Sequence, residues 1–155
     1  MQVRFSAVRP EGDHVLALPV TSGPGAVERS GQSGAALALL RRAAEAARFE
    51  GDAGALADAV LPEGDGVRRV LLAGVGSGGE SEGLEKAGGA LTARLLTSGE
   101  KRLVIDLAGL SAADPASAAA HIALGALLRG WRHDVYRTKL PAKARPSLEE
   151  IVIVG

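Results

Sequence analysis

Apolar residues follow two different spacings along the chain, and these predict three helices set among six strands. Short apolar runs or strict alternation predict strands, and apolar residues recurring every three to four positions predict helices. The predicted strands are Val3–Val8, His14–Val20, Leu56–Leu61, Arg69–Val75, Arg102–Leu107 and Glu150–Val154, and the helices are Ala35–Arg48, Glu82–Ser98 and Asp114–Trp131. Helices alternating with apolar strands predict an α/β fold with a mixed, mostly parallel sheet and helices on both faces.

The second and third predicted helices carry distinct apolar stripes. In the second, the stripe consists of Leu84, Ala87, Leu91 and Leu95. Gly88–Gly89 stands in the middle of this helix, where each glycine costs about 1 kcal/mol relative to alanine, so we expect it to pack closely against the sheet. In the third helix, Asp114 suits the N-cap position and Pro115 the first turn. The residues that line one face of this helix are Ala116, Ala120, Ala123, Leu124, Leu127 and Trp131.

Composition narrows the class of protein. The chain has 155 residues, which indicates a single domain over 1–155, and 18 basic residues balance 18 acidic ones. This zero net charge argues against a general nucleic-acid binder. Cysteine is absent, which excludes disulfides, thiolate metal sites and a cysteine nucleophile and fits the cytoplasm. We expect no membrane association, since no apolar run reaches the ~18 residues needed to cross a bilayer.

Gly74–Gly79 has the spacing G-x-G-x-x-G between a predicted strand and a predicted helix. In a dinucleotide-binding fold, backbone N–H groups of such a loop hold a pyrophosphate. The acidic residue that would bind the ribose is poorly placed, since Asp106 comes 27 residues after Gly79. Two interpretations stay open: a tight strand-to-helix connection, or a phosphate or nucleotide site.

Other candidate groups do not assemble into a catalytic site. His14, His121 and His133 lack a second ligand at metal-binding spacing, and no serine stands in a G-x-S-x-G motif. The segment Arg129–Arg145 is basic, with Asp134 its sole acid. This segment is interpreted either as a phosphate-contacting patch or as a solvated helix end, where the helix dipole favours cations.

Three segments together carry a family resemblance. They are Ala87–Ala90, preceded by Gly74–Gly76, then Val104–Leu110, and finally Gly125–Lys139, which is the most specific. In this order and spacing they resemble the N-terminal domain of the leucyl aminopeptidases, peptidase family M17. His133 departs from the pattern, because the family often has an aromatic residue such as Phe there.

The resemblance implies a macro-domain-like α/β fold and a two-domain parent enzyme. In that family a C-terminal domain holds two divalent metals, Zn or Mn, which activate water against an N-terminal peptide bond. Their ligands lie around a motif like N-T-D-A-E-G-R-L, and this chain contains no Asn. The resemblance therefore places no catalytic, cofactor or metal residue in this chain.

We accordingly expect a noncatalytic domain, linked to a catalytic domain and ending at a domain boundary at Gly155. In the family such a domain contributes to assembly of a homo-oligomer and frames access to the active site. Two alternatives stay open. One is a stand-alone macro-like module binding phosphate or ADP-ribose at Gly74–Gly79. The other is a nucleic-acid accessory domain acting through Arg129–Arg145.

Overall fold

The computed structural model describes residues 1–77, 80–110, 112, 114–135 and 146–155, with the backbone alone over 132–135. The elements occur in the predicted order. Its strands are β1 (Gln2–Ser6), β2 (Val15–Val20), β3 (Leu56–Glu63), β4 (Gly66–Gly74), β5 (Arg102–Asp106) and β6 (Glu150–Val154). Its helices are α1 (Gly34–Ala47), α2 (Ser81–Leu95) and α3 (Pro115–Val135), with a short 3-10 helix, η1 (Glu28–Ser30), in the loop before α1.

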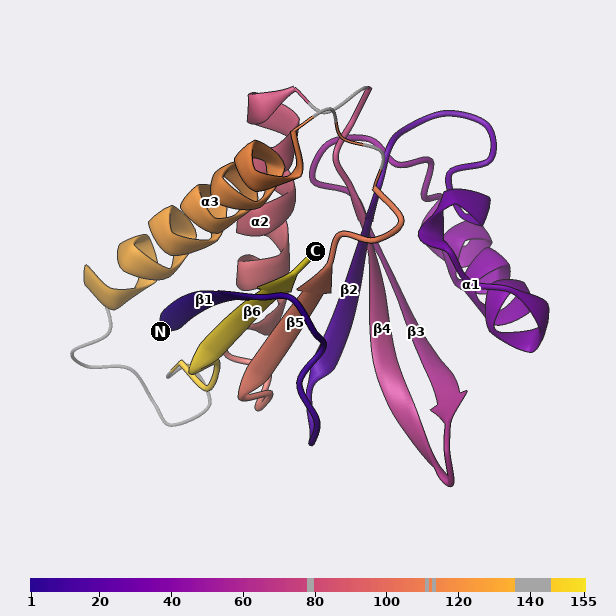
Figure 1. Cartoon of the computed structure of the whole chain (residues 1–155), viewed down its shortest axis with the longest axis horizontal. Coiled ribbons are helices and arrows are strands. Elements are labelled where there is room, and N and C mark those ends of the chain that lie inside the picture. The colour runs from indigo at the N-terminus through magenta and orange to yellow at the C-terminus, as the bar shows by residue number, and fades with distance from the viewer. Residues whose placement is uncertain (78–79, 111, 113, 136–145) are drawn as a thin grey trace.

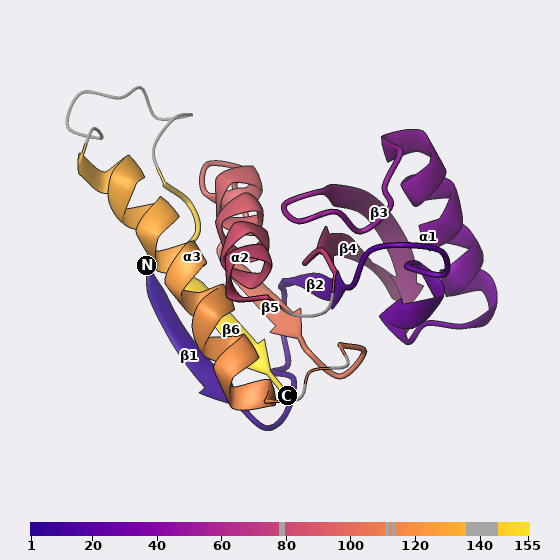
Figure 2. The same ribbon diagram turned by 90° about the horizontal axis from the view of Figure 1, so that it is seen from above.

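The strands form one sheet in the order β1-β6-β5-β2-β4-β3. All neighbouring strands run parallel except β3 and β4, which form an antiparallel hairpin. Helices α2 and α3 cover one face of the sheet, and α1 packs on the other (Figure 1, and from above in Figure 2). The predicted fold class, a mixed and mostly parallel sheet with helices on both faces, is confirmed.

The β3–β4 hairpin is longer than the pattern predicts. The strands predicted at Leu56–Leu61 and Arg69–Val75 leave seven residues between them, but β3 continues to Glu63 and β4 begins at Gly66, so that Gly64–Asp65 alone forms the turn. Gly64 has φ +59°, a left-handed conformation that a two-residue hairpin turn requires. Pro62 is tolerated because β3 is an edge strand, where a missing N–H leaves no ladder bond unmade.

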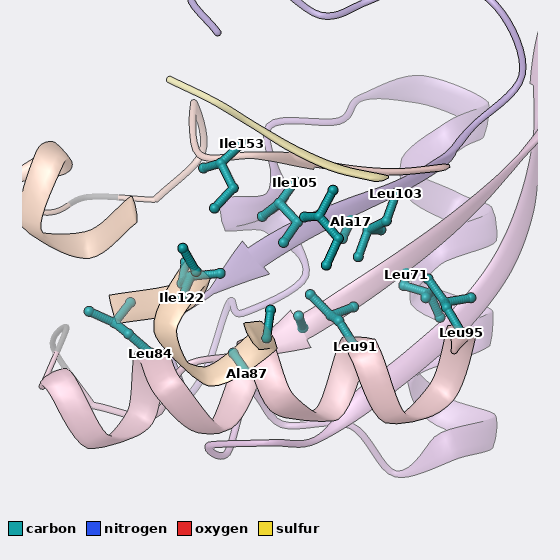
Figure 3. Close-up of a cluster of buried hydrophobic side chains, with 14 of the residues drawn as sticks. Ala17, Leu71, Leu84, Ala87, Leu91, Leu95, Leu103, Ile105, Ile122 and Ile153 are labelled. Atoms are coloured by element: carbon teal, nitrogen blue, oxygen red, sulfur yellow. The ribbon is translucent and has the colours of Figure 1, made fainter. Parts of the chain in front are cut away.

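Successive residues of the buried strands face two separate cores, as the alternation of side chains in a strand dictates. Figure 3 shows the core between the sheet and α2 and α3, built from Ala17, Leu71, Leu84, Ala87, Leu91, Leu95, Leu103, Ile105, Ile122 and Ile153. The intervening strand residues, such as Leu18, Leu72 and Val104, join Leu40 and Ala44 of α1 in the second core. The predicted stripe of α2 is confirmed, since all four of its residues are buried.

Helices α2 and α3 cross unusually closely at two glycines, Gly88 of α2 and Gly125 of α3. A Cβ atom at Gly88 would collide with the carbonyl oxygen of Ile122, and one at Gly125 would collide with that of Glu85. The prediction that Gly88 packs against the sheet is therefore wrong about its partner. Ala87 already occupies the sheet-facing stripe of α2, and the next residue lies about 100° further round the helix, toward α3.

Helix α3 begins as predicted, with the Asp114 carboxylate accepting a hydrogen bond from the Ser117 N–H at 3.2 Å. Its orientation differs from the pattern. Of the apolar face predicted on this helix, Ala123 is buried, but Ala116, Ala120, Leu124, Leu127 and Trp131 are exposed. The residues that pack inward are Ala118, Ala119, Ile122, Ala123 and Ala126. Helix α3 is apolar on both its inner and its outer side, and the residues that face the core are alanines together with Ile122.

His14 is buried at the start of β2 inside a cluster of charged groups. Its Nε2 accepts a hydrogen bond from Arg9 Nε at 2.9 Å, and its Nδ1 lies 2.9 Å from the Gly12 carbonyl oxygen. Burial, followed by the charges of Arg68 and Arg9, lowers the pKa of His14. Burial opposes the charged form of Glu63, but hydrogen bonds from Arg68 and Arg9 outweigh it and lower the pKa of that carboxyl.

The helix crossing predicts opposite outcomes for two adjacent glycines. Gly88→Ala should lower the free energy of unfolding by about 1–3 kcal/mol, because the added methyl group forces α3 away from α2. Gly89→Ala is the matched control. Its Cβ would lie 3.6 Å from the Gly125 carbonyl oxygen, an ordinary contact, so stability should stay unchanged or rise by up to about 1 kcal/mol. Urea unfolding measures both, and equal losses would contradict the crossing geometry.

The environment of His14 predicts a loss of stability in mild acid. As the pH falls through about 6.5, this histidine becomes protonated in the unfolded chain but stays mostly neutral in the folded chain. The equilibrium therefore shifts toward unfolding. His14→Gln should be less stable at pH 7 but should show a flatter dependence between pH 7 and about 5.5. His121→Gln retains the buried His14 with its neighbours Arg9 and Arg68 and serves as the control. Urea unfolding across this window measures the slopes, and one unchanged in His14→Gln would refute the assignment.

Candidate functional site

Three residues of the Gly74–Gly79 loop, Gly74, Val75 and Gly76, use their backbone donors inside the protein. The N–H of Gly74 donates to Ala55 O at 2.8 Å, that of Val75 to Val20 O at 3.0 Å, and that of Gly76 to Gly51 O at 3.0 Å. Gly78 and Gly79 lie outside the described residues. These three donors are unavailable to a phosphate, which favours the interpretation as a tight strand-to-helix connection.

Close backbone contacts account for the glycines of this connection. A Cβ atom at Gly74 would collide with the carbonyl oxygen of Asp52, and one at Gly83 with that of Val75. Gly76 has φ +80°, in the left-handed region. The cavity beside the loop has a volume of about 200 Å³ and includes Glu80 and Glu82 in its lining. That volume is below the roughly 300–1,000 Å³ of typical ligand pockets, and the two carboxylates oppose an anion.

The two histidines whose side chains the structure describes, His14 and His121, lie in different places. His14 is held by Arg9 and Gly12 at the start of β2. On α3, His121 Nδ1 lies 3.3 Å from Glu85 Oε2 of α2, without hydrogen-bond geometry. The side chain of His133 lies outside the described residues. Within the residues that the structure places, no group of three or more His, Asp or Glu side chains could hold a metal ion.

Of the basic segment Arg129–Arg145, residues 136–145 and the side chains of 132–135 lie outside the described part. Arg129 is exposed near the end of α3. Two arginines on the sheet, Arg4 and Arg102, are bridged by one acid. Glu150 accepts hydrogen bonds from Arg4 Nε at 2.6 Å and Arg102 Nε at 2.9 Å, linking three adjacent strands. The hydrogen bond from Arg4 is the main cause that lowers the pKa of Glu150.

A groove of about 800 Å³ lies where β1 and β6 end beside the first turns of α3. Its lining includes Phe5, Ala7, Pro115, Ala116, Ala120 and Gly155. In open α/β sheets the carboxyl ends of the strands are the usual place for a ligand. Among the described residues that line this groove, however, Ser6 and Asp114 supply the polar side chains, and Asp114 already caps α3. The groove therefore fits an apolar polypeptide surface better than a polar small molecule.

The sequence pattern alone did not identify this groove. Phe5 was assigned to a half-exposed strand, and Ala116 and Ala120 to the apolar face of a helix. The sequence feature that could have indicated the groove is the lack of Asp, Glu, Lys and Arg between Pro115 and Leu128 of α3. This is typical of a helix that is covered on more than one side.

Among the described residues, no helix has both the length and the apolar character needed to span a membrane. Residues 22–140 match the family described as the cytosol aminopeptidase family, N-terminal domain. A probable cytosol aminopeptidase of Caulobacter vibrioides is 36% identical over 160 residues, which cover 100% of this chain and 31% of that protein. A probable cytosol aminopeptidase of Rhizobium etli is 39% identical over 103 residues, or 65% of this chain and 20% of the relative.

Solved structures share the fold. A mutant of tomato leucine aminopeptidase superposes with a TM-score of 0.70 at 20% identity, covering 100% of this chain and 32% of that one. The bottromycin maturation enzyme BotP gives a TM-score of 0.60 at 23% identity, covering 93% and 28% respectively. The chain thus spans less than a third of the length of these proteins. With residues 22–140 matched, the chain belongs to the cytosol aminopeptidase family, in which it corresponds to the N-terminal domain.

Proposed function

We propose that this chain is the noncatalytic N-terminal domain of a longer metallo-aminopeptidase, whose linked C-terminal domain removes N-terminal residues from peptides. One observation carries the proposal. The whole chain aligns with a probable cytosol aminopeptidase of which it covers only 31%, and the family that it matches is defined as an N-terminal domain. More than two-thirds of that relative therefore lies outside the part that this chain represents.

The residues of this chain do not fit the two metal ions of such an enzyme. Binding two Zn or Mn ions takes several carboxylate, imidazole or amine donors around one point. Within the described ranges no three His, Asp or Glu side chains gather in that way, and Asn, part of the family's metal-site motif, does not occur in the sequence. We accordingly assign metal binding and the hydrolysis of the peptide bond to the linked domain.

The domain's own contribution, in this proposal, is to the assembly of a homo-oligomer and to access to the active site. A rigid sheet with two separate cores can hold a fixed surface against other parts of the enzyme. The relatives are named cytosol aminopeptidases, which supports a cytoplasmic location. The alternatives draw less support. The Gly74–Gly76 amides are occupied within the protein, and the zero net charge does not favour nucleic acid.

The proposal predicts that the purified 155-residue chain does not release leucine from a leucine anilide, with or without added Mn²⁺ or Zn²⁺. The physical reason is that, among the residues that the structure describes, no donor set gathers that could bind a metal ion and lower the pKa of a bound water molecule. A leucine aminopeptidase assayed in parallel serves as the positive control. Metal-dependent hydrolysis that copurifies with the chain and is abolished by a chelator would overturn the noncatalytic assignment.

A second prediction concerns the gene. The reading frame should continue beyond the codon for Gly155 and encode a stretch similar to N-T-D-x-E-G-R-L, with the ligands that this chain lacks. Sequencing the coding DNA past that codon measures this directly. A stop codon immediately after Gly155 would refute the linked catalytic domain and leave this fold as an independent module.

A further inference from the structure

The outer face of α3 is apolar although it lies at the surface. No charged side chain occurs between Pro115 and Leu128. The exposed fractions are 44% for Leu124, 44% for Leu127 and 65% for Trp131. A surface helix of a soluble domain normally carries charged and polar residues on its outer side. An exposed apolar stripe of this kind marks an interaction surface.

This stripe is continuous with the groove at the ends of β1 and β6. Ala116 and Ala120 belong to both, and Phe5 of β1, which is 60% exposed, lines the same groove. Gly155 also lines it, beside the first turn of α3, and Figure 2 shows the C-terminus next to that end of the helix. In a family member that continues beyond this domain, the following polypeptide therefore leaves from the edge of the apolar surface.

We propose that this surface, formed by Phe5, Ala116, Ala120, Leu124, Leu127 and Trp131, is where the linked catalytic domain docks onto this domain. The inference rests on the proposed function. It commits to the same polypeptide as the occupant because the chain exits at the groove, which gives a tethered domain a high effective concentration there. From Pro115 to Leu128 this helix carries no Lys or Arg, and the exposed Arg129 follows directly. This scarcity of cations along the surface disfavours nucleic acid or an anionic lipid surface, both of which require them.

The absence of cysteine from the chain allows a clean accessibility test. Leu127→Cys introduces one thiol on the proposed surface, and Leu124→Cys is a second variant for the case that the first folds poorly. Val67→Cys, at a position that is 72% exposed in β4 of the opposite sheet half, is the matched control. Each is introduced into the 155-residue chain and into the longer polypeptide encoded by the continued reading frame, and maleimide labelling rates are compared.

We expect rapid labelling of all the variants in the 155-residue chain. In the longer polypeptide, labelling at Leu127→Cys should slow by about tenfold or more, because reaction then requires the interface to open, while Val67→Cys should label equally in both. A rate at Leu127→Cys that is equal in the two polypeptides would overturn the docking surface while leaving the family assignment and the proposed function intact. Slowing in the short chain alone, increasing with protein concentration, would identify a second copy as the occupant and would also overturn it.

A charge-insertion pair separates docking from folding. Leu127→Glu should leave the melting temperature of the 155-residue chain nearly unchanged, because the side chain is already half exposed. In the longer polypeptide it should lower the melting temperature or reduce aminopeptidase activity, whereas Val67→Glu should do neither. Trp131, the single tryptophan of the chain, reports the exposure of this surface in the short form by its fluorescence. A reading frame that ends at residue 155 would overturn both the proposed function and this inference, and sequencing detects that outcome independently of the labelling.

Discussion

The close crossing of α2 and α3 is the constraint on which the arrangement of this domain depends. Gly88 and Gly125 each lie against a backbone carbonyl of the other helix, with no space for a side chain between them. Because the two backbones approach so closely, both helices fit on one face of the sheet, with Leu91 and Ile122 in the same core. That position brings the first turn of α3 beside the ends of β1 and β6, where the groove forms. The groove is therefore a consequence of the same close packing that brings the two helices together.

The sequence predicts the orientation of an element well when its apolar residues all lie on one side. In α2, Leu84, Ala87 and Leu91 point to one side and Glu82, Glu85 and Lys86 to the other, so the buried face follows from the spacing. Helix α3 has no such contrast, and its large apolar residues were assigned to the face that the structure leaves exposed. Periodicity alone cannot orient a helix that is apolar all round. Here Gly125 and the small residues near it set the orientation of α3, because only they permit its close approach to α2.

The candidate site could not be predicted from local sequence patterns. The G-x-G-x-x-G spacing of Gly74–Gly79 is typical of phosphate binding, yet the amides of its first three residues bond to Val20, Gly51 and Ala55 from two other segments of the chain. Those partners are distant in sequence, so no local pattern could reveal that the donors are already used. The same holds for Glu150, whose position between Arg4 and Arg102 follows from strand pairing and not from spacing.

A helix with two apolar sides makes sense in a domain that is one part of a longer enzyme. The side that includes Ala118, Ile122 and Ala126 stabilises the domain itself, and the larger side chains on the opposite face would be costly for solubility if nothing covered them. In the proposed docking, the linked catalytic domain is the partner that covers them, and relatives such as the Caulobacter vibrioides protein are more than three times the length of the matched domain. On this view α3 has the same role on both sides, namely apolar packing. One partner is the sheet of its own domain and the other is the domain that follows it.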